Sequence, residues 1–123
     1  MNKDLSIIIT LYKTPPDKLK LLKQYKNFNV LIFDQGSNNN KKTISNILKK
    51  KFRYFYSKKN IGLPKATNFL ISKVKTKFFL FTQADIEINN ISITRLIRSI
   101  KSRKDVVFAA PLLSKTVSKN FKK

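Results

Sequence analysis

Two carboxylates, Asp85 and Glu87, follow closely on the apolar stretch 78–81. A short uncharged stretch of this kind is typical of a strand buried on both faces, as in a parallel sheet covered by helices. In an open α/β sheet, ligands gather beyond the carboxyl ends of the strands. A carboxylate there can hold a hard cation and, through it, a phosphate-bearing ligand. The alternative is a pair of solvated loop acids, but two of the chain's six acidic residues lie at this one strand end.

Two other predicted strands also end in residues that could contact a ligand. Asp34 and Gly36 follow one strand, and Asn60 and Gly62 follow the next. Because the carboxyl ends of parallel strands lie on the same edge of a sheet, these loops can converge with the loop of Asp85 on one ligand. Each loop alone is equally well explained as a turn or a helix entry. Their combination in this order favours a binding site.

Strands and helices alternate along the chain, and this alternation must position the candidate residues. Apolar and β-branched stretches predict strands at residues 5–11, 28–33, 52–56, 78–81 and 105–110. Helical spacing of apolar residues predicts a helix after each of the first four strands. In the first of them Thr14 is expected to be the N-cap and Pro15 the first helical residue. The chain is therefore predicted to form an α/β fold with a mostly parallel sheet flanked by helices, and its first strand is expected to be central.

The composition narrows the possible chemistry. With 123 residues, 41% of them hydrophobic, the chain is expected to form one domain. It contains no cysteine and no histidine, which excludes disulfides, thiolate nucleophiles, zinc sites built on these residues and histidine-based triads. No apolar run approaches the roughly 20 residues that cross a bilayer, and the amino end lacks the apolar region of a signal peptide. The expected location is cytoplasmic.

The net charge of +21 raises the question of nucleic-acid binding. Only four of the 27 basic residues are arginines, the side chains best suited to bidentate recognition of bases and phosphates. The lysines are scattered through almost every segment. We therefore expect no specific nucleic-acid partner, and a basic nucleic-acid-associated protein is kept as the alternative of another class.

The order and spacing of these motifs resemble those of the family 2 glycosyltransferases, which have a GT-A fold. The matching segments are IIITLYK at 7–13, DQGS at 34–37, NIG at 60–62 with Asn68, and FTQAD at 81–85. The resemblance extends from about Leu5 to Pro111. By this resemblance, residues 1–111 would form a GT-A-type nucleotide-sugar-binding domain that lacks its acceptor half, and residues 112–123 a basic polar tail.

The resemblance implies roles for individual residues. Asp34 would hydrogen-bond the nucleotide base, and the remaining nucleotide-sugar-binding residues would be Thr10, Tyr12, Gly36, Asn60, Gly62, Asn68 and Gln83. Asp85 would carry a Mg²⁺ or Mn²⁺ ion that bridges the donor diphosphate. Gln83 stands where the family usually has the first acid of an Asp-x-Asp motif, so it would contribute only a neutral oxygen.

The family resemblance also implies inverting transfer of a sugar from a nucleotide-diphospho-sugar to a hydroxyl of a saccharide or lipid-linked acceptor. Such a transfer needs a carboxylate base, and after Glu87 the only acid is Asp105, at the wrong end of its predicted strand. No catalytic residue is assigned. The expectation is an amino-terminal fragment whose acceptor half a second chain could supply. The alternative is a module that holds a nucleotide-sugar without turnover.

Overall fold

The computed structural model describes residues 3–36, 39–105 and 109. The chain forms two compact units, Met1–Glu87 and Ile88–Lys123. The elements of the first unit are, in order, β1 (Leu5–Tyr12), the 3₁₀ helix η1 (Pro16–Tyr25), β2 (Asn29–Gln35), α1 (Lys41–Leu48), β3 (Phe52–Ser57), α2 (Leu63–Lys73) and β4 (Phe78–Thr82). The second unit contains α3 (Asn90–Ser102).

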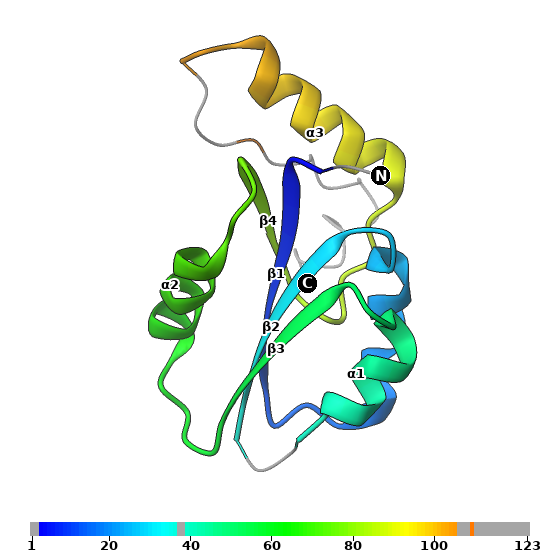
Figure 1. The fold of residues 1–123 in the computed structure, drawn as a ribbon, viewed down its shortest axis with the longest axis vertical. Helices are drawn as coiled ribbons and strands as arrows, with labels where there is room; N and C mark the ends of the chain where they lie inside the picture. The colour runs from blue at the N-terminus through cyan, green and yellow to red at the C-terminus, as the bar shows by residue number, and fades with distance from the viewer. Residues whose placement is uncertain (1–2, 37–38, 106–108, 110–123) are drawn as a thin grey trace, which may run out of the picture. The chain divides into compact units, whose positions relative to one another are not determined.

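The four strands form one parallel sheet in the order β3-β2-β1-β4 (Figure 1). This arrangement confirms the predicted α/β fold and the central position of β1. Each of β1, β2 and β3 extends past its predicted end, by one or two residues. The predicted strand at 105–110 falls mostly outside the described residues, and the division at residue 111 stays a prediction.

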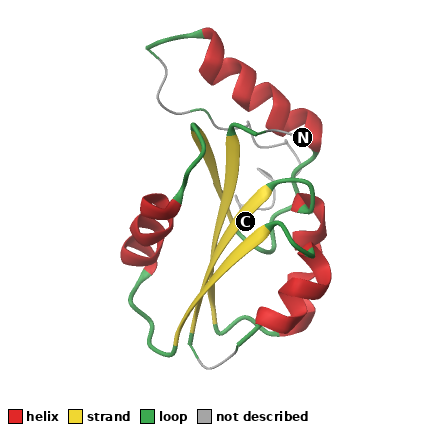
Figure 2. Ribbon diagram, viewed as in Figure 1, coloured by secondary structure: helices red, strands yellow, loops and turns green. Residues whose placement is uncertain are grey.

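Helices cover both faces of the sheet, with α2 on one side and η1 and α1 on the other (Figure 2). Side chains alternate between the two faces of a strand, so Ile8 packs with Ala66 and Leu70 of α2, whereas its neighbours Ile7 and Ile9 point to the opposite face. All three isoleucines are fully buried. Burial of each contributes roughly 1.5–3 kcal/mol, which makes β1 the centre of the core.

One prediction about the sheet is wrong. The stretch at 78–81 was expected to be buried on both faces, but β4 lies at the edge of the sheet that the described residues form. Phe79 and Phe81 are 41% and 42% exposed. The register pairs Phe81 with Ile8, which places both phenylalanines on the α2 face of the sheet. An apolar run shows that a strand is possible, but it does not show how many neighbours the strand has.

The first predicted helix also differs from expectation. It is a 3₁₀ helix in which Pro15, not Thr14, occupies the N-cap position, with no side-chain cap. The reason is the pair of prolines, because a residue that precedes proline is driven to extended backbone, and Pro15 itself has φ −71° and ψ 151°. The buried residues of η1 are Leu19, Leu22 and Tyr25. Their spacing of three residues matches the three residues per turn of this helix type.

Helix α3 begins with a side-chain cap. The Oδ1 atom of Asn89 accepts a hydrogen bond of 2.7 Å from the backbone N–H of Ser92, a common way of satisfying the free N–H groups of a first turn. Ile93 and Ile97 are the buried residues of this helix. Among the described helices, none is both long and apolar enough to span a membrane.

Candidate functional site

An open pocket of about 500 Å³ lies at the carboxyl ends of β1, β2 and β3. Its lining residues are Tyr12, Lys13, Gly36, Tyr56, Lys58 and Asn60. The structure thus brings together three of the candidate residues, Tyr12, Gly36 and Asn60, from three different strand ends. The lining also contains a second tyrosine and two lysines that the sequence did not single out.

Backbone hydrogen bonds hold these strand ends together. The N–H of Lys13 donates to the carbonyl oxygen of Gln35 at 2.8 Å, and the N–H of Gly36 donates to the carbonyl oxygen of Ser57 at 3.0 Å. Lys13 and Gly36 have positive φ angles of 48° and 103°. The loops after β1 and β2 therefore turn sharply at the pocket wall.

Glycine is required at position 36 for two reasons. Its φ lies in the region that L side chains rarely adopt, and a Cβ atom there would meet the Cγ atom of Lys13 at 2.7 Å and its backbone nitrogen at 3.3 Å. At Gly62, where φ is 89°, the nearest atom to an added Cβ would be Cδ of Pro64 at 3.9 Å. The two positions share a strained backbone, but only Gly36 is also crowded.

We expect Gly36→Ala to lower the free energy of unfolding by about 2–3 kcal/mol, and Gly62→Ala by about 1–2 kcal/mol, because only the first change adds a clash to the backbone strain. Urea denaturation of both variants measures the difference. Equal losses would show that Lys13 moves aside at little cost and that the crowding at Gly36 is unimportant.

Asp34 is fully buried beside this pocket. Its Oδ2 atom accepts hydrogen bonds from the backbone N–H of Asn40 at 3.1 Å, from the side-chain amide of Asn40 at 3.3 Å, and from the hydroxyl of Tyr54. Its Oδ1 atom is buried and has no hydrogen-bond partner among the described residues. Buried carboxylate oxygens are nearly always hydrogen-bonded, so this oxygen is an exception among the described residues, although Asp34 itself does not line the pocket.

Asn40 and Tyr54 fix the orientation of this carboxylate. The side-chain amide of Asn40 also donates to the carbonyl oxygen of Thr14 at 2.9 Å, which ties the loop after β1 to the loop after β2. Burial and the hydrogen bond to Asp34 raise the pKa of Tyr54 above its ordinary value of 10.0, so its hydroxyl stays a donor at neutral pH. Neither residue is among those that the sequence predicts for the site. Alternation along β3 could have placed Tyr54 on the face of Asp34, but nothing local pointed to Asn40.

The loop between β3 and α2 is held by two further hydrogen bonds. The buried side chain of Gln35 accepts from the N–H of Ile61 at 2.8 Å. The Oδ1 atom of Asn60 accepts from the N–H of Gly62 at 2.9 Å, a turn that asparagine forms readily. These bonds hold the loop at the rim of the pocket, where Asn60 is exposed.

The pocket combines aromatic rings with positive charge. The side chain of Tyr12 is 51% exposed, and the ammonium group of Lys13 lies 5.5 Å from the centre of its ring. The hydroxyl of Tyr56 donates to the carbonyl oxygen of Gly36 at 2.9 Å. No acid is among the described residues that line the pocket. Such a surface suits an anion that carries a flat ring, since aromatic faces stack and ammonium groups pair with phosphate.

The other candidate residues do not line this pocket. Thr10 is half-buried in β1, Gly62 is half-buried before α2, and Asn68 is exposed on α2. Gln83 and Asp85 are exposed in the loop after β4.

The separation of Asp85 from the pocket follows from strand length. β4 ends at Thr82, which pairs with Ile9, whereas β1 continues to Tyr12. Asp85 makes no hydrogen bond or ion pair with another described residue. In the described ranges, no three acids come together in a group that could hold a metal ion by themselves.

Comparisons with known proteins agree with this fold. The sequence model described as glycosyl transferase family 2 matches residues 6–123. The crystal structure of TarS 1–349 from S. aureus is similar with a TM-score of 0.63 and 21% sequence identity, over 89% of this chain and 38% of that one. At this identity the likeness shows the fold alone, which is GT-A-like. No curated protein matches the chain significantly. Because the family match spans almost the whole sequence, the chain belongs to glycosyl transferase family 2.

Proposed function

We propose that this chain binds a nucleotide-diphospho-sugar donor in the pocket at the carboxyl ends of β1, β2 and β3, for inverting transfer of the sugar to an acceptor hydroxyl. Membership of the family supports glycosyl transfer. The observation that carries the donor proposal is the buried Oδ1 atom of Asp34, which has no described partner and lies two residues before Gly36, a residue in the lining of a pocket that also contains two tyrosines and two lysines.

The nucleotide base is proposed to be uracil or thymine. A carboxylate oxygen accepts hydrogen bonds from N–H or O–H groups, so Oδ1 of Asp34 suits a ligand that presents such a donor. The N3–H of uracil or thymine is such a donor, and the ring of Tyr12 or Tyr56 offers a face for stacking. The register pairs Asp34 directly with Tyr56, so one base could reach both side chains.

The diphosphate is proposed to interact with positive charge from two sources. Lys13 and Lys58 line the pocket, and Asp85 would hold Mg²⁺ or Mn²⁺ with Gln83 as a neutral ligand. A single exposed carboxylate fits a magnesium ion that takes its other ligands from water and phosphates. Such an ion neutralises the charge that develops on a departing diphosphate.

The remaining assignments complete the donor site. Asn60, Gly62 and Asn68 are proposed to lie near the ribose and diphosphate, and Thr10 near the base. The acceptor is proposed to be a saccharide or a lipid-linked molecule. No catalytic base is assigned, because the described residues that line the pocket include no acid. A second chain that supplies the acceptor half and a cytoplasmic location both stay predictions.

A comparison of UDP with CDP tests the proposed function. In the presence of Mg²⁺, we expect UDP to shift the NMR signals of the pocket residues and to bind about tenfold more tightly than CDP, because cytosine presents an acceptor where uracil presents N3–H. Calorimetry gives both affinities. Equal affinity would exclude base recognition by Asp34. Binding of a DNA or RNA oligonucleotide that falls steeply with salt, without UDP binding, would favour the nucleic-acid alternative.

A further inference from the structure

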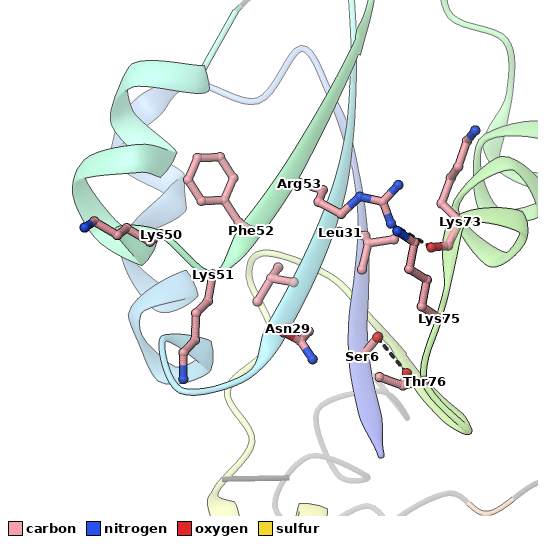
Figure 3. Close-up of a pocket in the computed structure, with 11 residues that line it drawn as sticks. Ser6, Asn29, Leu31, Lys50, Lys51, Phe52, Arg53, Lys73, Lys75 and Thr76 are labelled. Atoms are coloured by element: carbon pink, nitrogen blue, oxygen red, sulfur yellow. Dashed lines mark hydrogen bonds between the residues drawn. The ribbon is translucent and has the colours of Figure 1, made fainter. Parts of the chain in front are cut away.

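A second pocket, of about 330 Å³, lies at the amino ends of the strands, opposite the carboxyl ends that form the donor pocket (Figure 3). Its floor is the α2 face of the sheet. The register pairs Ser6 of β1 with Asn29 of β2, and Leu31 of β2 with Arg53 of β3. The pocket is well separated from the donor pocket, because Ser6 and Tyr12 lie six strand residues apart, which is roughly 20 Å.

Cationic side chains are concentrated in this pocket. They account for five of its eleven lining residues, about twice their share of the whole chain, in which 27 of 123 residues are basic. The five are Lys50, Lys51, Arg53, Lys73 and Lys75. The described lining contains no acid. The scattered lysines of the sequence therefore do gather at one concave place in the fold.

Arg53 is held in a fixed position. Its Nη1 atom donates to the carbonyl oxygen of Lys73, the last residue of α2, at 2.7 Å. Its guanidinium group also lies 5.5 Å from the centre of the Phe55 ring. A guanidinium group carries five N–H donors in a rigid plane, so most of them remain for a ligand. This preorganisation reduces the entropy that Arg53 would lose on binding.

The segment that carries Lys75 is fixed as well. The hydroxyl of Thr76 donates to the carbonyl oxygen of Phe78 at 2.8 Å, and it pairs with the hydroxyl of Ser6 at 2.7 Å (Figure 3). These bonds attach the segment after α2 to the start of β1. Lys75 therefore extends from an anchored backbone, although its own side chain is exposed.

A structural explanation covers only part of this cluster. Arg53 and Lys73 lie at the carboxyl end of α2, where positive charge stabilises the helix dipole. The side chains of Lys51 and Lys75 form no hydrogen bond or ion pair with a described residue, and the repulsion between like charges would favour moving them apart. In Figure 3 the ammonium group of Lys73 points away from Ser6 and Thr76, and that of Lys51 points away from Arg53. Arg53 and Lys75 are therefore the charges that lie on the same side of the pocket.

We propose that this pocket is an anion site that binds a phosphate group, separate from the donor site. Arg53 supplies a planar fork that matches two phosphate oxygens, and Lys75 acts as a point charge on the same side of the pocket. The exposed side chain of Lys51 would turn toward Arg53 on binding and add a second point charge. The exposed amide of Asn29 supplies a neutral donor. The volume admits a phosphate group together with a small part of the molecule that carries it. The ligand is thus either free inorganic phosphate or a small phosphate ester.

NMR titration of the 123-residue protein with inorganic phosphate and with glycerol phosphate, at constant ionic strength, tests the proposal. We expect saturable shifts of the amide signals of Asn29, Arg53 and Thr76. The double variant Lys51→Gln with Lys75→Gln should raise the dissociation constant about tenfold, because two charge-assisted contacts are lost. The control is Lys18→Gln with Lys20→Gln, which removes the same charge from two exposed positions on η1. This control should change the dissociation constant for phosphate by less than about twofold.

The outcomes separate the possible ligands. Tighter binding of glycerol phosphate identifies an ester as the ligand, and equal binding identifies free phosphate. Equal weakening by the two double variants, or shifts that never saturate, would overturn the proposal and assign the effect to the general field of the protein. Binding of UDP should be unchanged in the Lys51 and Lys75 variant, so failure of this site and failure of the donor site are distinguishable.

Discussion

Asp34→Asn is expected to weaken the binding of UDP by about 10- to 100-fold and to leave the fold intact. The amide oxygen of asparagine can replace Oδ2 and accept the hydrogen bonds from Asn40 and Tyr54. The amide nitrogen then replaces Oδ1, where it presents N–H groups to the N3–H of uracil. A donor would face a donor, and the base would lose its only specific contact with this side chain.

The same substitution should change which base is preferred. Cytosine has an acceptor at N3, so the affinity for CDP should stay the same or improve while that for UDP falls. Calorimetry with both nucleotides measures this change. Tyr54→Phe is the matched control, because it removes one donor to Oδ2 and leaves Oδ1 unaltered. Unchanged UDP affinity in Asp34→Asn would remove Asp34 from the site.

Asparagine is a more informative replacement than alanine at this position. Alanine would remove the acceptor that two N–H groups of Asn40 and the hydroxyl of Tyr54 share, and it would leave the backbone N–H of Asn40 with only the Tyr54 oxygen as its acceptor. Each unpaired buried group costs about 1–3 kcal/mol, so weaker binding by Asp34→Ala could reflect a disturbed loop. Thermal unfolding of both variants would show whether their folds are comparable.

Asp85→Asn is expected to reduce the metal-dependent part of UDP binding by about tenfold or more. The substitution keeps the shape and one oxygen of the side chain but removes the only charged metal ligand proposed for this site. Because Asp85 is exposed and makes no hydrogen bond or ion pair with a described residue, its loss should not affect folding. Binding in the absence of a metal ion should change little or improve. Affinity for UDP with and without Mn²⁺ measures both quantities.

Two further variants sharpen the metal experiment. Gln83→Asp adds a second carboxylate and should tighten the metal-dependent binding. Glu87→Gln removes an equally exposed acid two residues further along and should have no effect. Full retention of the metal effect in Asp85→Asn, with its loss in Glu87→Gln, would move the ion to Glu87.

The fold was predictable because its signals are local. Alternating strand and helix patterns are sufficient to indicate a parallel sheet, and the β-branched residues of β1 indicated its central position. The exposure of Phe79 and Phe81 was not predictable in this way, because it depends on the number of neighbouring strands. The 3₁₀ form of η1 agrees with the three-residue spacing of Leu19, Leu22 and Tyr25, but the same spacing also occurs on one face of an α-helix, so it does not distinguish the two helix types.

The candidate site was less predictable because its contacts join distant parts of the chain. Asp34 was identified from its strand end, but its partners Asn40 and Tyr54 lie six and twenty residues further on. The position of Asp85 depends on where β4 stops relative to β1. That point is set by the pairing register of the two strands, which the amino-acid composition of β4 does not reveal. Lys13 and Lys58 were not distinguishable among so many lysines.

The unpartnered oxygen of Asp34 also implies a trade-off between stability and activity. A buried acceptor without a donor destabilises a protein by about 1–3 kcal/mol. The three hydrogen bonds to Oδ2 nevertheless hold the carboxylate of Asp34 in this position. A ligand that supplied a donor to this oxygen, as proposed for the nucleotide base, would relieve this destabilisation. Binding at the proposed site would then protect the protein against unfolding.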